Sequence, residues 1–393
     1  MIVRPLAPLF PARVARRRSA PPRRHRGARR ALLWGAAGFV LAQLGFAAAV
    51  ETVLPQVRDP EYGYRQFRAT GLQGAHPDRP LVLLIGTSRT QNAVDPSAMG
   101  FPDEPGSPLV FNAGLSGTRP VHLPLNLRRF RGAGVRPAAV LVELFPATLV
   151  VSGPADYLFA DLEQQLTAAD LKNLEPYLAD PAALRRRWAL GRANSLHALR
   201  PVVLAYLAPK WRSWQHIDYL REHTRPDGFL PYPFETVTDE YRARKRAETA
   251  KTYAAVNGNL FVSPLSDRAY RDLVADCRGA GVPVAFFLTP ESPVFRSWYT
   301  PEARAALAAF TRVLSDELGC PVFEAPADYG EADFADGHHM LRPAARRFSR
   351  ELADRHVGPW LASVRPPVGG APMTPRLLGP AVATTFFAIG GEP

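Results

Sequence analysis

Cysteine is scarce in this sequence, which has no internal repeat. Only two cysteines, Cys277 and Cys320, occur in 393 residues. Their spacing matches no zinc-binding motif, and the pair allows at most one disulfide. Each cysteine also lies beside apolar, strand-like sequence, where a free buried thiol is common. Both states stay open at this point.

Acidic residues are absent from the first 30 positions, which contain ten arginines. These arginines account for most of the formal net charge of +12, so the rest of the chain is nearly neutral. A basic, proline-rich leader before a balanced body differs from the continuous basic face of a protein that follows nucleic-acid phosphates. We therefore expect no nucleic-acid partner.

Long apolar runs are also rare, and one stands out. Residues 31–50 contain no charged side chain, and as a helix rising about 1.5 Å per residue they match a hydrocarbon core about 30 Å thick. Because the arginines lie only on the N-terminal side, the positive-inside tendency predicts a cytoplasmic leader at 1–30, a single-pass anchor at 31–50 and an extracytoplasmic body. We favour an uncleaved anchor in the inner or cytoplasmic membrane, with a cleaved signal sequence as the alternative.

Short apolar runs alternate with helix-like stretches in the body of the chain. The runs predict strands at 81–85, 109–112, 139–144, 282–288 and 321–323. Helices are predicted at 120–132, 266–279, 301–318 and 343–361. This alternation is typical of an α/β fold with a parallel sheet covered by helices on both faces, in which sites form at the carboxyl ends of the strands.

We expect one large domain over residues 51–362, interrupted by a helical insertion at about 150–262. Helices are predicted there at 167–178 and 181–199, followed by an aromatic-rich stretch at 206–234. The arginines at 185–187 either meet an anionic glycan or lipid headgroup or form a solvated helix face. Trp211, Trp214 and Tyr219 either stack on sugar rings or pack the insertion against the core. Residues 363–393 are rich in Pro and Gly, which predicts a disordered tail.

Two short motifs bring together the residue types of a serine nucleophile and its base. Ser88 follows the first predicted strand in Gly86-Thr-Ser88, and Asp336-Gly-His-His339 precedes the last predicted helix. A serine hydroxyl needs a base to accept its proton, and that base works best when a third group fixes its orientation. We therefore predict Ser88 as nucleophile, His339 as base and Asp336 as the orienting carboxylate.

These motifs also allow other interpretations. Asp333 is an alternative carboxylate for the histidine. A metal site using His338, His339 and an acid is disfavoured, because adjacent histidines point in different directions and no further histidine cluster completes a ligand set. We predict no metal and no other cofactor. The residues after Ser88 also differ from the Gly-x-Ser-x-Gly nucleophile elbow.

Three sequence blocks together resemble the SGNH (GDSL-like) hydrolase superfamily. They are Gly86-Thr-Ser88, Asn112-Ala-Gly-Leu-Ser-Gly117 and Asp336-x-x-His339. The resemblance implies a flavodoxin-like three-layer sandwich, the SGNH hydrolase fold. It also implies an oxyanion hole formed by the backbone N–H groups of Ser88 and Gly117.

The third family block departs from the usual pattern. Where the family has Gly-x-Asn-Asp, this chain has Phe145-Pro-Ala-Thr148, with Ala147 in the place of the Asn. Losing one oxyanion donor costs on the order of 100-fold or more in rate. Asn112, Thr148 and Arg89 are candidate replacements for that donor.

This departure resembles an envelope-modifying branch that includes the D-alanine transfer protein of teichoic acids and the alginate O-acetylation proteins. The resemblance implies a membrane-anchored serine esterase or O-acyltransferase acting on a cell-envelope glycan. Its partners would be an acylated glycan or acyl donor and a membrane-bound O-acyltransferase. From their places near strand ends, Arg89, Asn92 and His122 are predicted substrate contacts. The alternative is a non-catalytic glycan-binding or assembly subunit that retains the fold.

Overall fold

The computed structural model describes residues 24–364, except for 151–152, 154, 160–161, 208–218, 221 and 327. Most of the predicted basic leader, nearly all of the predicted tail, and Trp211 and Trp214 lie outside the described residues. The chain forms two compact units. One contains residues 64–154 and those from 219 onward, and the other contains the residues up to 63 and residues 155–218.

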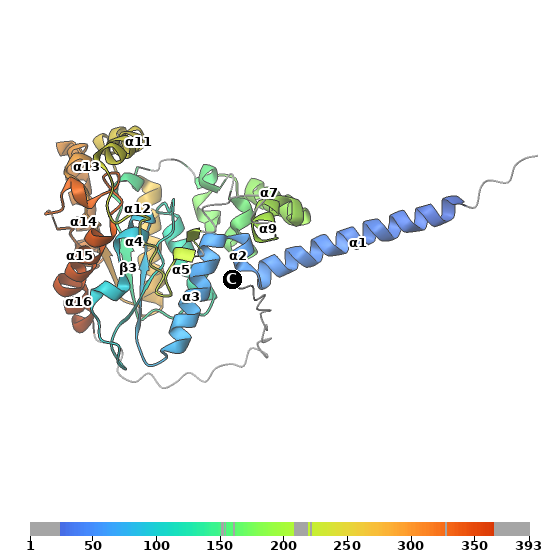
Figure 1. The fold of residues 1–393 in the computed structure, drawn as a ribbon, viewed down its shortest axis with the longest axis horizontal. Helices are drawn as coiled ribbons and strands as arrows, with labels where there is room; N and C mark the ends of the chain where they lie inside the picture. The colour runs from blue at the N-terminus through green and yellow to red at the C-terminus, as the bar shows by residue number, and fades with distance from the viewer. Residues whose placement is uncertain are drawn as a thin grey trace, which may run out of the picture. The chain divides into compact units, whose positions relative to one another are not determined.

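The larger unit is built on five parallel strands in the order β2-β1-β3-β4-β5 (Figure 1). The strands are β1 (Leu81–Ile85), β2 (Leu109–Asn112), β3 (Ala139–Glu143), β4 (Val284–Phe287) and β5 (Val322–Phe323). This is the order of flavodoxin-like sheets, and their ligands bind at the carboxyl edge. The predicted α/β fold with a parallel sheet is confirmed; the last three strands are shorter than predicted.

Helices cover both faces of this sheet, because the strand residues are apolar on both sides. On one face, strand residues such as Leu84 and Phe287 form a core with Phe348 and Trp360 of the C-terminal helices. On the other face, α5 (His122–Gly132) contacts α12 (Pro264–Gly279), and Tyr270 of α12 packs edge-on against Phe286 at 5.7 Å between ring centroids. The sheet unit is therefore a three-layer sandwich.

Several helices of the sheet unit begin at Ser, Thr or Asp residues that accept a backbone N–H, often with Pro at the next position. Ser263 of α12, Ser292 of α13 and Thr300 of α14 are three such caps, each followed by Pro. The remaining helices of this unit are α3 (Pro60–Ala75, which begins before residue 64), α4 (Ser88–Ala93), η1 (Pro96–Met99), η2 (Pro146–Thr148), α11 (Asp239–Gly258), α13 (Pro293–Ser297), α14 (Pro301–Arg312), η7 (Val313–Glu317), η8 (Glu331–Asp333), α15 (Arg342–Leu352), η9 (Ala353–Val357) and α16 (Gly358–Ser363).

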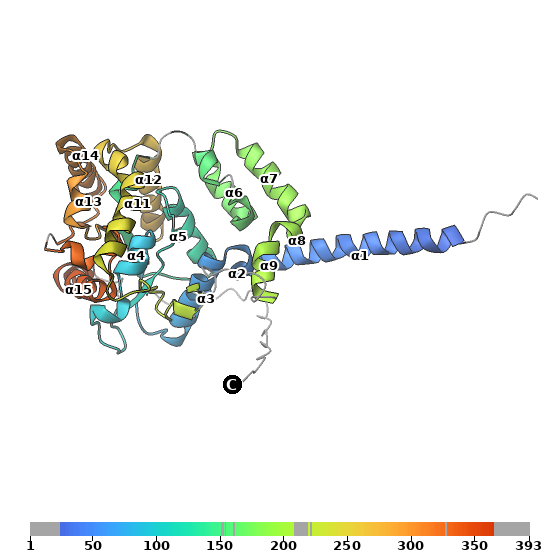
Figure 2. The same cartoon turned by 45° about the horizontal axis from the view of Figure 1, so that its top comes forward.

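The smaller unit consists of helices. They are α1 (Arg24–Thr52), α2 (Pro55–Arg58), η3 (Ala155–Phe159), η4 (Glu163–Gln165), α6 (Ala168–Leu174), η5 (Glu175–Tyr177), α7 (Pro181–Ala193), α8 (Ser195–Ala198) and α9 (Arg200–Leu207) (Figure 2). Within α1, Gly27–Thr52 is long and apolar enough to cross a membrane, judged by length and composition. The segment expected as one insertion is divided, since residues 155–218 belong to this unit whereas α11 belongs to the sheet unit.

The two cysteines are free and buried, so the disulfide left open above does not form. Burial raises the pKa of the Cys277 thiol to about 12 and also raises that of Cys320. Thiolate is the reactive form of cysteine, so both side chains are inert packing groups.

Candidate active site

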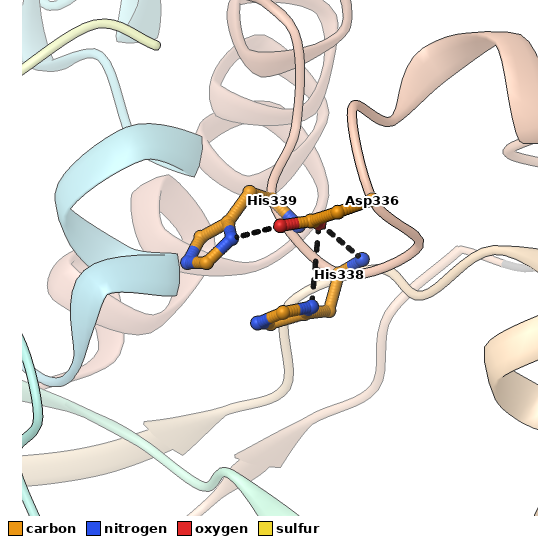
Figure 3. Close-up of side chains that lie close together, drawn as sticks. All are labelled: Asp336, His338 and His339. Carbon is orange, nitrogen blue, oxygen red and sulfur yellow. Dashed lines mark hydrogen bonds and ion pairs between the residues drawn. The ribbon is translucent and has the colours of Figure 1, made fainter. Parts of the chain in front are cut away.

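Ser88, His339 and Asp336 form a hydrogen-bonded chain at the carboxyl edge of the sheet. Ser88 Oγ lies 2.9 Å from His339 Nε2, and His339 Nδ1 lies 2.7 Å from Asp336 Oδ2. Figure 3 shows the second of these contacts. The serine begins α4 directly after β1, and the histidine is 251 residues further along the chain.

A tight turn presents the histidine and the aspartate. Asp336 Oδ1 accepts the backbone N–H groups of His338 at 3.1 Å and His339 at 2.9 Å. Gly337 has a φ of +102°, a conformation that residues with a Cβ rarely adopt. Its carbonyl accepts the N–H of Ser292 at 2.9 Å, which ties the turn to the N-terminus of α13.

The charge of Asp336 is stabilised inside this turn. Burial by itself would raise the pKa of the carboxyl, but interactions with His339 and His338 outweigh burial and hold the pKa well below its ordinary value. The carboxylate is therefore ionised at neutral pH, as required of a group that orients an imidazole and stabilises its protonated form.

His338 has a different role from its neighbour. It is 5% exposed, and its ring packs against Phe295 at 5.4 Å and Tyr253 at 5.1 Å between centroids. Burial, together with the nearby His339, lowers the pKa of His338 to about 4, so the ring is neutral. The side chain fills an aromatic pocket beneath the turn.

Asp336, His338 and His339 are close enough to be considered as a metal site, with ligand atoms within 4.8 Å of one another. Zinc bonds of about 2.0–2.2 Å in tetrahedral geometry separate neighbouring ligand atoms by about 3.3 Å. The 2.7 Å contact between Asp336 and His339 is shorter and has the length of a charge-assisted hydrogen bond. These residues therefore fit a proton-handling pair better than a zinc ligand set.

Asp333, the alternative carboxylate, is committed elsewhere. Its Oδ2 accepts the N–H of Gly330 at 2.9 Å and pairs with Arg347 at 3.0 Å. It caps a local turn at η8 and leaves Asp336 as the partner of the histidine.

Glu143, which the sequence analysis did not single out, holds the turn that carries Ser88. Its Oε2 accepts the N–H of Thr87 at 2.7 Å, the hydroxyl of Thr87 at 2.9 Å and the hydroxyl of Thr90 at 2.7 Å. A Cβ on Gly86 would come within 2.6 Å of this oxygen. Gly86 has no positive φ, so glycine is needed here for space and not for a special backbone conformation. The sequence feature that could have identified this role is the acidic residue at the end of an otherwise apolar strand, β3.

Arg89 completes this buried network and is not free to bind substrate. Its side chain is 1% exposed; Nη1 lies 2.8 Å from Glu291, Nη2 donates to the carbonyl of Thr289 at 2.7 Å, and Nε lies 3.6 Å from Glu143. Burial raises the pKa of Glu291, opposed by the charge of Arg89. The predictions of Arg89 as a substrate contact and as an oxyanion donor are inconsistent with this geometry.

The other predicted donors and contacts are structural as well. Asn112 uses both amide hydrogens on the carbonyls of Thr90 and Val94, at 2.8 and 2.6 Å. The hydroxyl of Thr148 donates to the carbonyl of Phe145 at 2.7 Å, and Asn92 donates to that of Leu230 at 2.7 Å. Asn112 and Thr148 therefore have no side-chain hydrogen left for an oxyanion, and Asn92 holds the backbone of Leu230.

His122 is placed at the start of α5, where its Nδ1 accepts the N–H of Arg119 at 3.0 Å. Burial, with the charges of Arg129 and Arg119, lowers the pKa of His122 to about 4, so the ring is neutral. Its role at the helix start does not require a substrate.

The second sequence block, residues 112–117, lies against the turn that carries Ser88. Leu115 donates its N–H to the carbonyl of Gly86 at 3.0 Å, and Ser116 Oγ donates to Gln91 of α4 at 3.1 Å. A Cβ on Gly114 would lie 2.7 Å from the backbone nitrogen of Gln91. Gly117 itself is exposed and has a φ of +69°. Its N–H has no hydrogen-bond partner within the described part of the chain.

Two residues of the aromatic-rich stretch at 206–234, together with Tyr241 of α11, form an aromatic group that borders His339. The ring of Tyr232 stacks at 6.3 Å from the imidazole, and its hydroxyl lies 3.2 Å from that of Tyr241. Phe234 packs against both tyrosines and is 45% exposed. Tyr219 donates its hydroxyl to the carbonyl of Pro231 at 2.7 Å, so this aromatic residue supports the same segment from within.

A scan against protein-family models finds no match to this chain, and a search of curated proteins finds none either. The geometry of the site is therefore the basis for a function of this chain.

Proposed function

We propose that this chain is a membrane-anchored, extracytoplasmic serine esterase or O-acyltransferase of the SGNH type that acts on a cell-envelope glycan. The observation that carries the proposal is the hydrogen-bonded order Ser88, His339, Asp336, with distances of 2.9 and 2.7 Å. A carboxylate kept ionised beside an imidazole, which in turn contacts a hydroxyl, is the arrangement that activates a serine.

The proposed reaction has two stages. Ser88 Oγ attacks the ester carbonyl while His339 Nε2 accepts its proton, and Asp336 stabilises the resulting imidazolium. The tetrahedral intermediate collapses, the leaving alcohol takes the proton from His339, and the acyl group stays on Ser88 as an ester. Water then completes hydrolysis, or a sugar hydroxyl completes transfer. By resemblance, a membrane-bound O-acyltransferase supplies the acyl group.

Backbone donors stabilise the oxyanion in this proposal. The N–H groups of Ser88 and Gly117 have no partner among the described residues, whereas the side chains of Asn112, Thr148 and Arg89 are all committed. A hole with two donors is weaker than one with three, by about 3 kcal/mol for the missing one. Slow turnover follows from this difference.

The missing third oxyanion donor favours the alternative function, a non-catalytic glycan-binding or assembly subunit. Ala147, where the resembling family has an Asn, is buried in an apolar cluster with Phe145, Leu260 and Phe295. That position supplies no polar group. In this alternative the chain keeps the fold and the three-residue arrangement but has no useful rate.

Covalent labelling separates the two functions. The full chain, purified in detergent, is treated with a fluorophosphonate probe, and hydrolysis of 4-nitrophenyl acetate is followed in parallel. Variants Ser88→Ala and His339→Gln are compared with Ser297→Ala, which removes an exposed serine from α13. We expect labelling of the wild type and of Ser297→Ala, and none of the other two.

Equal labelling of wild type and Ser88→Ala would exclude Ser88 as the nucleophile. Absence of labelling in a folded wild type would favour the non-catalytic subunit. The membrane orientation needs its own test, a reporter active only in the cytoplasm fused after Ala362. Reporter activity there would contradict an extracytoplasmic site.

A further inference from the structure

The apolar helix α1 is not free along its whole length. Gln43, the one polar residue among residues 31–50, is 5% exposed. Its side-chain oxygen accepts the N–H of Leu196 in α8 at 3.0 Å, and its amide nitrogen lies 3.4 Å from Asn194. The C-terminal part of α1 therefore packs against α7 and α8 (Figure 2).

Charged groups mark the C-terminal end of the apolar stretch. Glu51 accepts the N–H of Ala168 at 2.9 Å and lies 3.4 Å from Arg192. Arg58 donates to the carbonyls of Val50 and Glu51, at 3.2 and 3.1 Å. At the other end, Arg29 and Arg30 precede the uncharged residues.

The length of α1 leaves little room to keep α8 out of a membrane. The 20 residues from 31 to 50 span about 30 Å, which is the thickness of a hydrocarbon core. Only residues 31–42 precede the contact at Gln43, and they span about 18 Å. If α8 stayed in water, Arg29 and Arg30 would be drawn into hydrocarbon, which is strongly unfavourable for charged groups.

Exposed apolar side chains lie next to this contact. Within α7, α8 and α9, four leucines are exposed. They are Leu190 (70%), Leu196 (36%), Leu204 (39%) and Leu207 (78%). They come from one short stretch of α7, α8 and α9, whereas such residues are normally scattered on a soluble surface.

We propose that α8, α9 and the C-terminal end of α7 insert beside α1 into the membrane leaflet on the side of the sheet unit. These three segments form a helical wedge that holds the chain in the membrane in addition to the single span of α1. The partner is the acyl-chain and headgroup region of a phospholipid leaflet. From Gln43 to Glu51 is about 12 Å along the helix axis, so α8 lies below the headgroup level. The inference rests on the membrane anchoring of α1 that the proposed function includes.

Site-directed fluorescence in lipid tests this wedge. The full chain is reconstituted into phosphatidylcholine nanodiscs, and single cysteines at Leu196, Leu204 and Ala182 are labelled with an environment-sensitive NBD dye. Cys277 and Cys320 are buried, at 1% and 4% exposed, so they stay unlabelled. Ala182 is the matched control, since it is exposed at the opposite end of α7. Leu33→Cys reports on α1 itself.

We expect labels at positions 196 and 204 to have blue-shifted emission, to be quenched by lipids carrying a nitroxide on the acyl chain, and to be protected from iodide in solution. The label at 182 should show the reverse. If the label at position 33 senses lipid but those at 196 and 204 behave like the label at 182, the proposed insertion of α8 and α9 is wrong and the anchoring by α1 is retained. If the label at position 33 is also in water, both the anchoring and the insertion are contradicted. Esterase activity is measured separately and does not enter this result.

A second measurement avoids labelling altogether. In the unmodified chain, hydrogen exchange of the backbone amides of residues 195–207 is compared between nanodiscs and mild detergent at matched temperature. Slower exchange in nanodiscs for this segment, with unchanged exchange in α12, supports insertion. Equal exchange in both environments contradicts it.

Discussion

Replacing Glu143 by Gln tests whether the buried carboxylate organises the turn that carries Ser88. Glu143 is 1% exposed and accepts three hydrogen bonds on one oxygen, from the N–H and hydroxyl of Thr87 and the hydroxyl of Thr90. It also neutralises Arg89, with Nε at 3.6 Å. Gln keeps one acceptor oxygen but loses the charge, and its NH₂ group then faces the guanidinium.

The loss of stability expected for Glu143→Gln follows from these contacts. Hydrogen bonds to charged groups contribute about 1.5–3 kcal/mol each and neutral ones about 0.5–1.5, so three weakened bonds amount to about 3 kcal/mol. Glu291 still pairs with Arg89 at 2.8 Å, so the full cost of about 3–5 kcal/mol for an orphaned buried charge is not reached. In a domain of this size the loss lowers the Tm by roughly 6–12 °C.

The assay is thermal unfolding of the full chain in detergent, together with the rate of fluorophosphonate labelling at Ser88. Glu302→Gln is the control, because Glu302 is exposed in the first turn of α14. The control should stay within about 0.5 kcal/mol of the wild type. A Glu143→Gln chain that melts and labels like the wild type would refute a positioning role for this carboxylate.

Three further outcomes are expected. Gly86→Ala should cost about 1–3 kcal/mol in urea unfolding, since its Cβ meets the buried carboxylate of Glu143 at 2.6 Å; an unchanged midpoint contradicts this packing. The pKa of His338 is lowered to about 4 from an ordinary 6.5, so the unfolded chain takes up the proton first as the pH falls. The contribution of His338 to the free energy of unfolding is fully present above about pH 6.5 and falls by about 3 kcal/mol towards pH 4. The pKa of His122 is also lowered to about 4, so this side chain adds to the loss of stability at low pH. In His338→Phe the free energies of unfolding at pH 7.5 and pH 4.5 should therefore differ by less than in the wild type. Asp336→Asn should slow labelling on the order of 10³-fold or more by losing the charge that orients the imidazole; a rate near wild type would remove this carboxylate from the mechanism.

Local sequence determined the elements and the chemistry-bearing residues. Apolar runs predicted all five strands, with β1 and β2 at their observed bounds, because a strand covered on both faces needs continuous apolar sequence. The pairing of Ser88 with a distant Asp-x-x-His followed from residue type and order. The 20-residue α11 was not predicted, because its sequence has no clear apolar face at helical spacing and only Thr249 and Asn257 are buried.

Tertiary structure decided which polar residues remain available. Arg89, Asn92 and Asn112 looked like binding groups in the sequence, yet each satisfies carbonyls or carboxylates of segments far away in the chain. Pairing of that kind depends on which strand ends lie side by side, and no local pattern encodes it. In the sequence, Glu143 is only a charged residue at the end of an apolar strand. Because β3 pairs with β1, its carboxylate lies against the turn that carries Ser88. Burial makes an unpaired charge costly, so these residues stabilise the fold, and Ser88, His339 and two backbone N–H groups remain for the proposed reaction.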